Sequence, residues 1–327
     1  MGKEHVHFNV CLGNPPYQID DGGNGKSAKP VYNLFVEEAK KIATDSISYI
    51  MPAKWYSGGK GLDQFRTDML SDERIKKLID FENYKDVFPN LGGLAGGACI
   101  FLWDKHYNGP CAVENFRTDG SNVLTRPLNE FDTFIRQNQA VEIVRKINEM
   151  TKGQEKLSSR ISSRKPFGIP TNYEPKENGL PCWYVQKVGL KYANPEDIND
   201  PKGYLNKWKF LIPPAPIAGQ TDFTKPVAFF TENNTRISKP GECCTESWLV
   251  AGAFDTKEEV ENYKSYLMTK IARFLLLQSV VSQHISTKTF KFIPDFGSYK
   301  EPYSDEMLRK LWSLSDDEWA YIDSRIS

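Results

Sequence analysis

Short apolar runs alternate with amphipathic stretches over the first hundred residues. Between the runs, apolar residues at helical spacing predict one helix over residues 31–44 and another around Leu62–Leu70. This alternation is typical of an α/β sheet, whose ligand crevices lie where the strands end. Four runs have the length and the bounding residues of strands, at residues 8–13, 47–53, about 77–82 and about 97–104. The first of them is predicted to be a short buried strand.

The pattern changes after about residue 115. Apolar residues at helical spacing over 116–150 predict a long helix that bridges two domains. Residues 151–255 hold more than half of the twenty prolines and many aromatic residues, which predicts a compact β-rich domain. Residues 256–327 are predicted to be helical and to begin with a capping box at Thr256. Strand-like runs in the β-rich part are Trp183–Val188, Trp208–Ile212, Val227–Thr231 and Trp248–Ala251.

The tetrapeptide Asn14-Pro15-Pro16-Tyr17 directly follows the first apolar run. The exocyclic amine of adenine is a poor nucleophile because its lone pair is delocalised into the ring. The Asn14 side-chain oxygen and the Pro15 carbonyl can each accept one amine hydrogen, which localises the pair and stabilises the developing charge. Two prolines keep the backbone extended, and Tyr17 offers a ring face to a base. The same residues could instead form a rigid corner with a surface tyrosine.

Further segments extend this motif into a resemblance. In order and spacing the chain resembles the gamma-class N6-adenine DNA methyltransferases, with the nearest likeness to the TaqI-like and restriction-modification methylases. The match runs from Asn14 to about residue 105 and continues more loosely as a target-recognition region with a helical C-terminus. The segments that carry it are Asn14–Tyr17, Val31–Ala39, Ile47–Trp55, Leu78–Phe81, Val87–Pro89 and Ala98–Trp103.

The resemblance implies a site and a cofactor. It places Phe88 as a second aromatic wall opposite Tyr17, so that the two rings clamp an adenine flipped out of the duplex. It places Phe35 beside the adenine of S-adenosylmethionine, the implied methyl donor. The alternative for Phe88 is that it only plugs the sheet edge.

One part of the resembling class is missing from this chain. Members of the class bind the cofactor mainly through a glycine-rich turn and an acidic residue that precede the Asn-Pro-Pro-Tyr motif, and only thirteen residues precede Asn14 here. We therefore expect a partial class I methyltransferase (Rossmann-like) sheet that lacks its N-terminal half, over residues 1–115. The strand carrying Val10 to Leu12 would be an exposed apolar edge. Either a separate chain carries the cofactor motif, or this chain is a truncated remnant or fragment.

Charge separates the regions of the chain. Lys plus Arg and Asp plus Glu both number 42, so the whole molecule does not indicate a polyanionic partner. Residues 151–240, however, carry a basic surplus, and a DNA-contacting surface is expected there. Such a surplus is also common on ordinary solvated faces. The cations predicted to face DNA are Arg160, Arg164, Lys165, Lys207 and Lys209.

Other features limit the classes of function. The six cysteines show no CxxC pair and the four histidines no ligand spacing, so no metal site is predicted. No apolar run reaches the length of a membrane span, and we expect a cytoplasmic protein. The sequence thus predicts site-specific DNA adenine methylation within a restriction-modification system, with an associated endonuclease as one possible partner. The alternatives are a catalytically inactive DNA-binding or specificity fragment and a protein or RNA methyltransferase; the long region after residue 116 argues against the latter.

Overall fold

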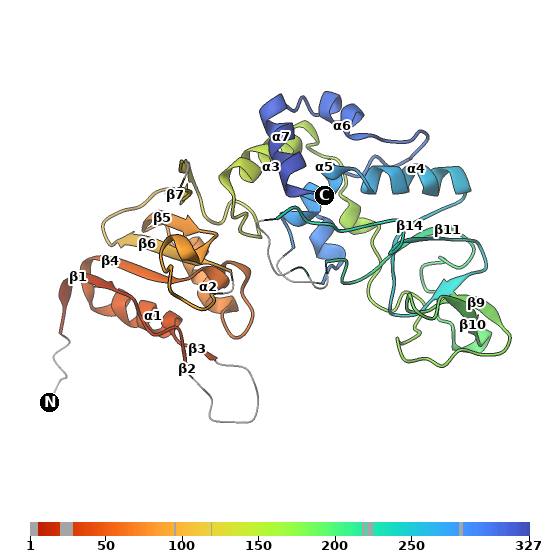
Figure 1. Ribbon diagram of the computed structural model, residues 1–327, viewed down its shortest axis with the longest axis horizontal. Helices are drawn as coiled ribbons and strands as arrows, with labels where there is room; N and C mark the ends of the chain where they lie inside the picture. Colours follow the sequence, from red (N-terminus) through yellow and green to blue (C-terminus); the bar gives the residue numbers. More distant parts are fainter. Residues whose placement is uncertain are drawn as a thin grey trace. The chain divides into compact units, whose positions relative to one another are not determined.

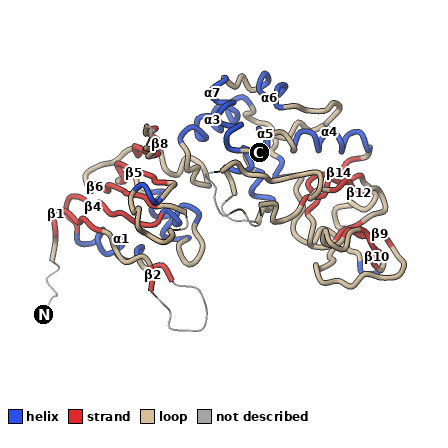
Figure 2. The backbone as a smooth tube through the Cα atoms, in the orientation of Figure 1, coloured by secondary structure: helices blue, strands red, loops and turns tan. Residues whose placement is uncertain are grey.

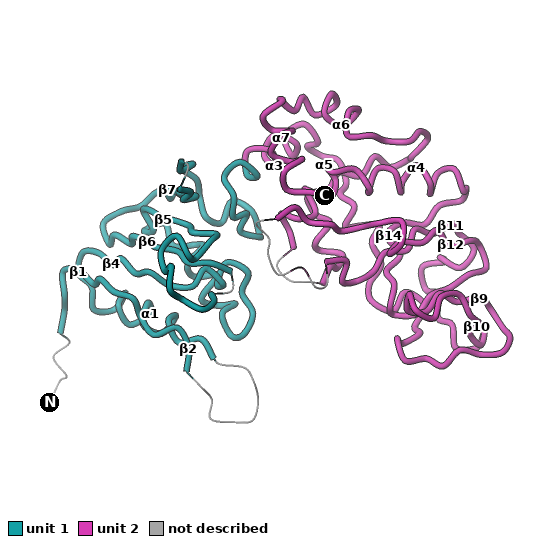
Figure 3. The backbone as a smooth tube through the Cα atoms, viewed as in Figure 1, with its two compact units in different colours: residues 1–141 teal, residues 142–327 magenta. Residues whose placement is uncertain are grey.

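The chain forms two compact units, Met1–Val141 and Glu142–Ser327, and the boundary falls within one helix (Figure 3). The computed structural model describes residues 6–19, 29–94, 96–118, 120–217, 220, 225–280 and 284–327. Each unit has its own sheets and its own core, so each is described by itself. Among the described residues, no helix combines the length and the apolar character needed to cross a membrane.

The first unit is built on a six-stranded mixed sheet with the strand order β1-β4-β6-β5-β7-β8 (Figure 1). β1 and β4 are parallel, β6 is antiparallel to both of its neighbours, and β5 is parallel to β7. The predicted α/β alternation and its four strands are confirmed. The strands are β1 (Phe8–Gly13), β4 (Ala43–Pro52), β5 (Ile75–Phe81), β6 (Ala98–Asp104), β7 (Cys111–Asn115) and β8 (Asn122–Arg126), with a separate ribbon of β2 (Gln18–Ile19) and β3 (Lys29–Pro30).

Two helices share a core with one face of this sheet. α1 (Tyr32–Ile42) and α2 (Asp63–Ser71) lie where helical spacing predicts them, and the short turns η1 (Ala53–Ser57) and η2 (Tyr84–Asp86) follow β4 and β5. Their apolar stripes pack against every second residue of the strands, because side chains alternate between the two faces of a sheet. Fully buried members of this core include Val36, Met69, Ile47 and Phe101.

The other face of the sheet is much less covered at β1. Phe8, Val10 and Leu12 are 50%, 50% and 75% exposed, and in β1 only Cys11 is half-buried. β1 is an edge strand, so one side of its backbone has no strand partner among the described residues. The prediction of a buried strand at residues 8–13 is therefore wrong in its burial, while the exposed apolar edge is present as expected.

The second unit combines two small sheets with several helices (Figure 2). The sheet orders are β10-β9-β13 and β12-β11-β14. The residues predicted as a recognition domain and those predicted as a helical region lie together in this unit. Its elements are β9 (Leu180–Trp183), β10 (Leu190–Ala193), β11 (Trp208–Ile212), β12 (Arg236–Ser238), β13 (Cys243–Cys244), β14 (Leu249–Phe254), α4 (Lys257–Leu267), α5 (Lys270–Leu277), α6 (Asp305–Leu311) and α7 (Asp316–Arg325), with short turns η3 (Leu157–Ser159), η4 (Pro195–Asp197) and η5 (Thr287–Phe290).

Three predicted elements differ from the structure. The long helix over 116–150 is reduced to α3 (Asn138–Met150), because a turn containing Gly120 reverses the chain so that β8 pairs with β7, and Pro127 then ends that strand. The apolar residues Phe134 and Ile135 are buried from irregular chain instead. Val227–Thr231 is not a strand; only Val227 forms an isolated bridge, to Ile326, just after Pro226. The predicted strand Trp183–Val188 is also wrong beyond Trp183, because the chain turns there and the Val188 backbone N–H donates to the Val185 carbonyl at 2.8 Å.

Candidate active site

The tetrapeptide leaves the C-terminal end of β1 at the edge of the sheet. Asn14 is exposed, Pro15 is buried and Tyr17 is half-buried. The Tyr17 carbonyl accepts a hydrogen bond of 3.2 Å from the Val31 backbone N–H, which ties the loop to the start of α1. The buried Pro15 thus anchors a loop whose carboxamide remains open to a ligand.

The strand register brings a second loop to the same edge. Pro52, at the end of β4, pairs with Ala98 of β6, which also pairs with Phe81 at the end of β5. The loop of residues 82–97 therefore leaves the sheet where the tetrapeptide does. It carries Phe88, which is half-buried and whose backbone N–H donates to the Tyr84 carbonyl at 2.8 Å. Among the described residues, no ring contact joins Tyr17 to Phe88, and the clamp of two rings stays a prediction.

Three buried tyrosine hydroxyls lie at this end of the sheet without a hydrogen-bond partner: those of Tyr17, Tyr32 and Tyr56. Burial raises the pKa of Tyr17, although the nearby Asn14 side chain offsets part of the rise without reaching hydrogen-bond geometry. Burial likewise raises the pKa of Cys99, to about 12, so this thiol stays protonated at neutral pH. Each unpaired buried group costs about 1–3 kcal/mol of stability. The polar groups at this end of the unit therefore lower the stability of the fold.

A buried ion pair adjoins these hydroxyls. Arg136 Nε donates to Asp80 Oδ2 at 2.8 Å, and the Arg136 guanidinium lies 5.6 Å from the Tyr56 ring centre. Asp80 Oδ1 and Arg136 Nη2 are buried and unpaired. Burial raises the pKa of Asp80; Arg136 opposes that rise, as does the nearby Tyr56 hydroxyl, which does not reach hydrogen-bond geometry. The sequence analysis missed Tyr56, Asp80 and Arg136; the carboxylate inside an apolar strand was the available signal.

The side chain assigned to the cofactor lies near the start of α1. Phe35 is 45% exposed and its neighbour Leu34 is 52% exposed. An aromatic ring left this open on the first turn of a helix is free to contact a ligand. Phe35 alone does not form a cofactor site.

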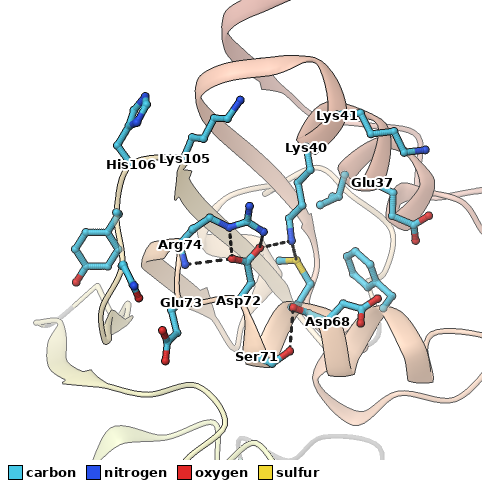
Figure 4. A pocket seen from close by; sticks show the side chains of 15 residues that line it. Glu37, Lys40, Lys41, Asp68, Ser71, Asp72, Glu73, Arg74, Lys105 and His106 are labelled. Atoms are coloured by element: carbon cyan, nitrogen blue, oxygen red, sulfur yellow. Dashed lines mark hydrogen bonds and ion pairs between the residues drawn. The ribbon is translucent and has the colours of Figure 1, made fainter.

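A cavity of about 850 Å³ lies at the opposite end of the same sheet (Figure 4). At its floor Asp72 accepts hydrogen bonds from Lys40 Nζ at 2.8 Å and Arg74 Nε at 2.7 Å, and from the Trp103 indole at 3.0 Å. Figure 4 shows the Lys40 and Arg74 side chains converging on this carboxylate. Lys40 and Arg74 are both paired with Asp72, and the cavity lies away from the tetrapeptide.

In the second unit, the predicted DNA-facing cations are largely paired with carboxylates. Arg160 Nε donates to Asp295, and its guanidinium lies over the rings of Phe254 and Tyr299. Arg164 and Lys165 share Glu246, whereas Lys207 pairs with Asp255. Arg164 and Lys165 keep 74% and 48% of their side chains exposed, so both remain available to a phosphate.

Lys209 is a correction to the sequence analysis. Its side chain is fully buried, and its ammonium donates to the carbonyls of Leu205, Lys207 and Lys239 at 3.5, 2.6 and 2.9 Å. Burial lowers its pKa to about 8. β11 is the central strand of its sheet, so a lysine on its covered face points inward and does not face DNA.

Comparisons with known proteins bear on the first unit. Residues 2–88 match the Eco57I restriction-modification methylase family. Over 111 residues the chain is 33% identical to an uncharacterized adenine-specific methylase of Mycoplasma pneumoniae, a match that covers 33% of this chain and 26% of that protein. The resemblance to adenine-specific methylases is confirmed.

Two solved structures resemble a larger share of the chain. The type IIG restriction endonuclease BpuSI is similar with a TM-score of 0.38 and 12% identity, over 95% of this chain and 49% of that one. The type IIL restriction-modification enzyme MmeI, solved in complex with DNA, is similar with a TM-score of 0.37 and 9% identity, over 96% of this chain and 54% of that one. The chain therefore spans about half the length of these two proteins and 26% of the curated relative.

Proposed function

We propose that this chain carries the amine-orienting loop and the target-recognition part of a DNA adenine methyltransferase of a restriction-modification system. The observation that carries the proposal is the position of Asn14, exposed at the mouth of β1 on a loop anchored by the buried Pro15. The family match over residues 2–88 supports it. Residues 151–255 would recognise the target sequence, and Arg164 and Lys165 would contact phosphates.

In this proposal the chain's own residues prepare the base amine. The Asn14 side-chain oxygen and the Pro15 carbonyl accept the two hydrogens of the adenine amine and draw its nitrogen toward tetrahedral geometry. The half-buried Tyr17 ring stacks on the flipped base, and Phe88 closes the other side. S-adenosylmethionine, when bound, supplies an electrophilic methyl group. No side chain needs to titrate, because the carboxamide and the carbonyl act as fixed acceptors.

The described residues do not fit a complete cofactor site. Phe35 is the one side chain assigned to the cofactor, and 45% of it is exposed. We propose that a further polypeptide segment, carrying a glycine-rich turn, completes the site by adding a strand to the open edge of β1. The same segment would also have to pack over Phe8, Val10 and Leu12, which are 50%, 50% and 75% exposed on the face of the sheet.

A reconstitution assay tests the proposal. Methyl transfer from labelled S-adenosylmethionine to unmethylated duplex DNA is measured for this chain alone and after mixing with the protein encoded immediately upstream. Transfer that appears only on mixing supports a shared active site. DNA binding without transfer under either condition would instead support the second candidate, a catalytically inactive specificity fragment, which the exposed Arg164 and Lys165 favour.

A further inference from the structure

The loop that carries Phe88 is held at both of its ends by two consecutive residues. Arg136 Nη1 donates to the Gly96 carbonyl at 2.8 Å, near the end of the loop. Gln137 Nε2 donates to Glu82 Oε2 at 3.0 Å, at the start of the loop. Because both donors come from one short segment, the two ends of the loop cannot separate without breaking at least one of these bonds.

The closing turn of the loop is shaped around the arginine. Gly97 has a φ of +78°, and a Cβ built there would lie 2.2 Å from the Phe81 carbonyl oxygen and 2.8 Å from Arg136 Nη2. Glycine is therefore required both by its backbone conformation and by the space that the guanidinium fills. The Gly97 carbonyl in turn accepts a hydrogen bond of 3.0 Å from the Ala53 backbone N–H at the end of β4.

The pair that anchors this arrangement is not optimised for stability alone. Asp80 is 1% exposed and binds Arg136 through Oδ2, while Asp80 Oδ1 and Arg136 Nη2 have no partner. Unpaired buried polar atoms in a native structure call for a reason beyond stability, and such departures gather at functional sites.

We propose that Arg136 is a positioning residue for the Phe88 loop, which it clamps to the end of β5 through Asp80 and Gly96. The catalytic consequence rests on the proposed function: a loop that is released would no longer place the aromatic wall against the flipped base. Arg136 itself does not touch the reacting atoms in this scheme. Displacing a positioning group by about 1 Å can cost on the order of 100-fold in rate.

The first arm of the test observes the loop directly. 4-Fluorophenylalanine is incorporated at position 88 of the full chain, and its ¹⁹F NMR signal is recorded for the wild type, Arg136→Gln, Arg136→Lys and Gln137→Ala. Loss of the clamp is expected to shift or split the signal in Arg136→Gln, and less so in Gln137→Ala. Arg74→Gln is the matched control, since Arg74 pairs with Asp72 at the other end of β5, and its spectrum should be that of the wild type.

The second arm measures methyl transfer in the mixture in which the wild-type chain is active. Arg136→Gln is expected to lower kcat by roughly 10- to 100-fold with little change in KM for DNA. If Arg136→Gln does not fold, the ¹⁹F spectra and the methyl-transfer rates of Arg136→Lys and Gln137→Ala test the positioning role in its place. Folded variants whose ¹⁹F signal matches that of Arg74→Gln overturn the positioning role. A shifted signal together with no transfer by the wild type would sink the proposed function while leaving the clamp in place.

Discussion

Two buried carboxylates, one beside each end of β5, differ in how completely their oxygens are hydrogen-bonded. Asp72, just before the strand, receives hydrogen bonds from Lys40, Arg74 and Trp103 and has no unpaired oxygen. Asp80 lies near the other end, and one of its oxygens has no hydrogen-bond partner. One nitrogen of Arg136, with which Asp80 pairs, also has none. The first arrangement is what stability alone would select. The second lies at the edge where the Asn14–Tyr17 loop emerges, and we infer that its cost is retained for function.

The largest effect is expected at Asn14. Asn14→Ala should lower kcat for methyl transfer by about 100- to 1,000-fold, because one of two acceptors for the amine is lost. The melting temperature should not change, since the side chain is exposed. Asn108→Ala, an exposed asparagine beside the cavity at the opposite edge, is the control. Equal activity of the two variants would remove the functional distinction between the edges.

At Asp72 we expect a loss of stability with little change in activity, the opposite of the result expected at Asn14. Asp72→Asn places an amide against three donors and should lower the free energy of unfolding by about 3 kcal/mol. Its three partners tie α1 to β6 and to the start of β5. Methyl transfer per folded molecule should stay within about twofold of the wild type, because the site lies at the other edge. Urea denaturation followed by Trp fluorescence measures the stability, and a loss under about 1 kcal/mol would contradict the structural role.

The contributions of Asp72 and Asp80 to stability should also depend on pH in opposite directions. Burial acts to raise the pKa of Asp72, but hydrogen bonds and charge from Arg74 and Lys40 lower it to about 2, below its ordinary value of 3.8. The stabilisation is therefore present above pH 4 and is lost as the pH falls from 4 toward 2, by about 2 kcal/mol. Asp80, whose pKa is raised, has the opposite sign and loses stability as the pH rises through its folded pKa. In Asp72→Asn the decline between pH 4 and 2 should be correspondingly shallower.

These differences also mark how far the sequence could predict the molecule. Hydrophobic periodicity predicted the strands and helices of the first unit, because burial on one face is a local signal. It failed for residues 116–137, where Phe134 and Ile135 are buried from irregular chain that only tertiary contacts hold in place. It also misplaced Lys209, since alternation gives no indication of which face of β11 is covered.

The candidate site was predictable only in part. The tetrapeptide is contiguous, so its chemistry can be inferred from the residues themselves. Arg136 and Asp80 are 56 residues apart, and no spacing rule links them. Asp80 of β5 pairs with Asn115 of β7, and the Asn115 side chain donates to the Arg136 carbonyl at 3.0 Å, which brings Arg136 to Asp80. The unpaired atoms depend on packing details that a sequence does not encode locally.

The smallest effect concerns the unpaired hydroxyls. Tyr56→Phe removes a buried hydroxyl that has no partner, so the free energy of unfolding should stay the same or rise by up to about 1 kcal/mol. Tyr263→Phe is the matched control in the second unit, because the Tyr263 hydroxyl donates to the Ala251 carbonyl at 2.7 Å. That variant should lose about 1 kcal/mol. Calorimetric melting of both variants compares them, and a loss in Tyr56→Phe as large as that in Tyr263→Phe would show that the Tyr56 hydroxyl is paired in solution. In that case the buried polar groups near Asn14 would be as fully hydrogen-bonded as Asp72. The loss of stability that we infer to be retained for function would then be absent.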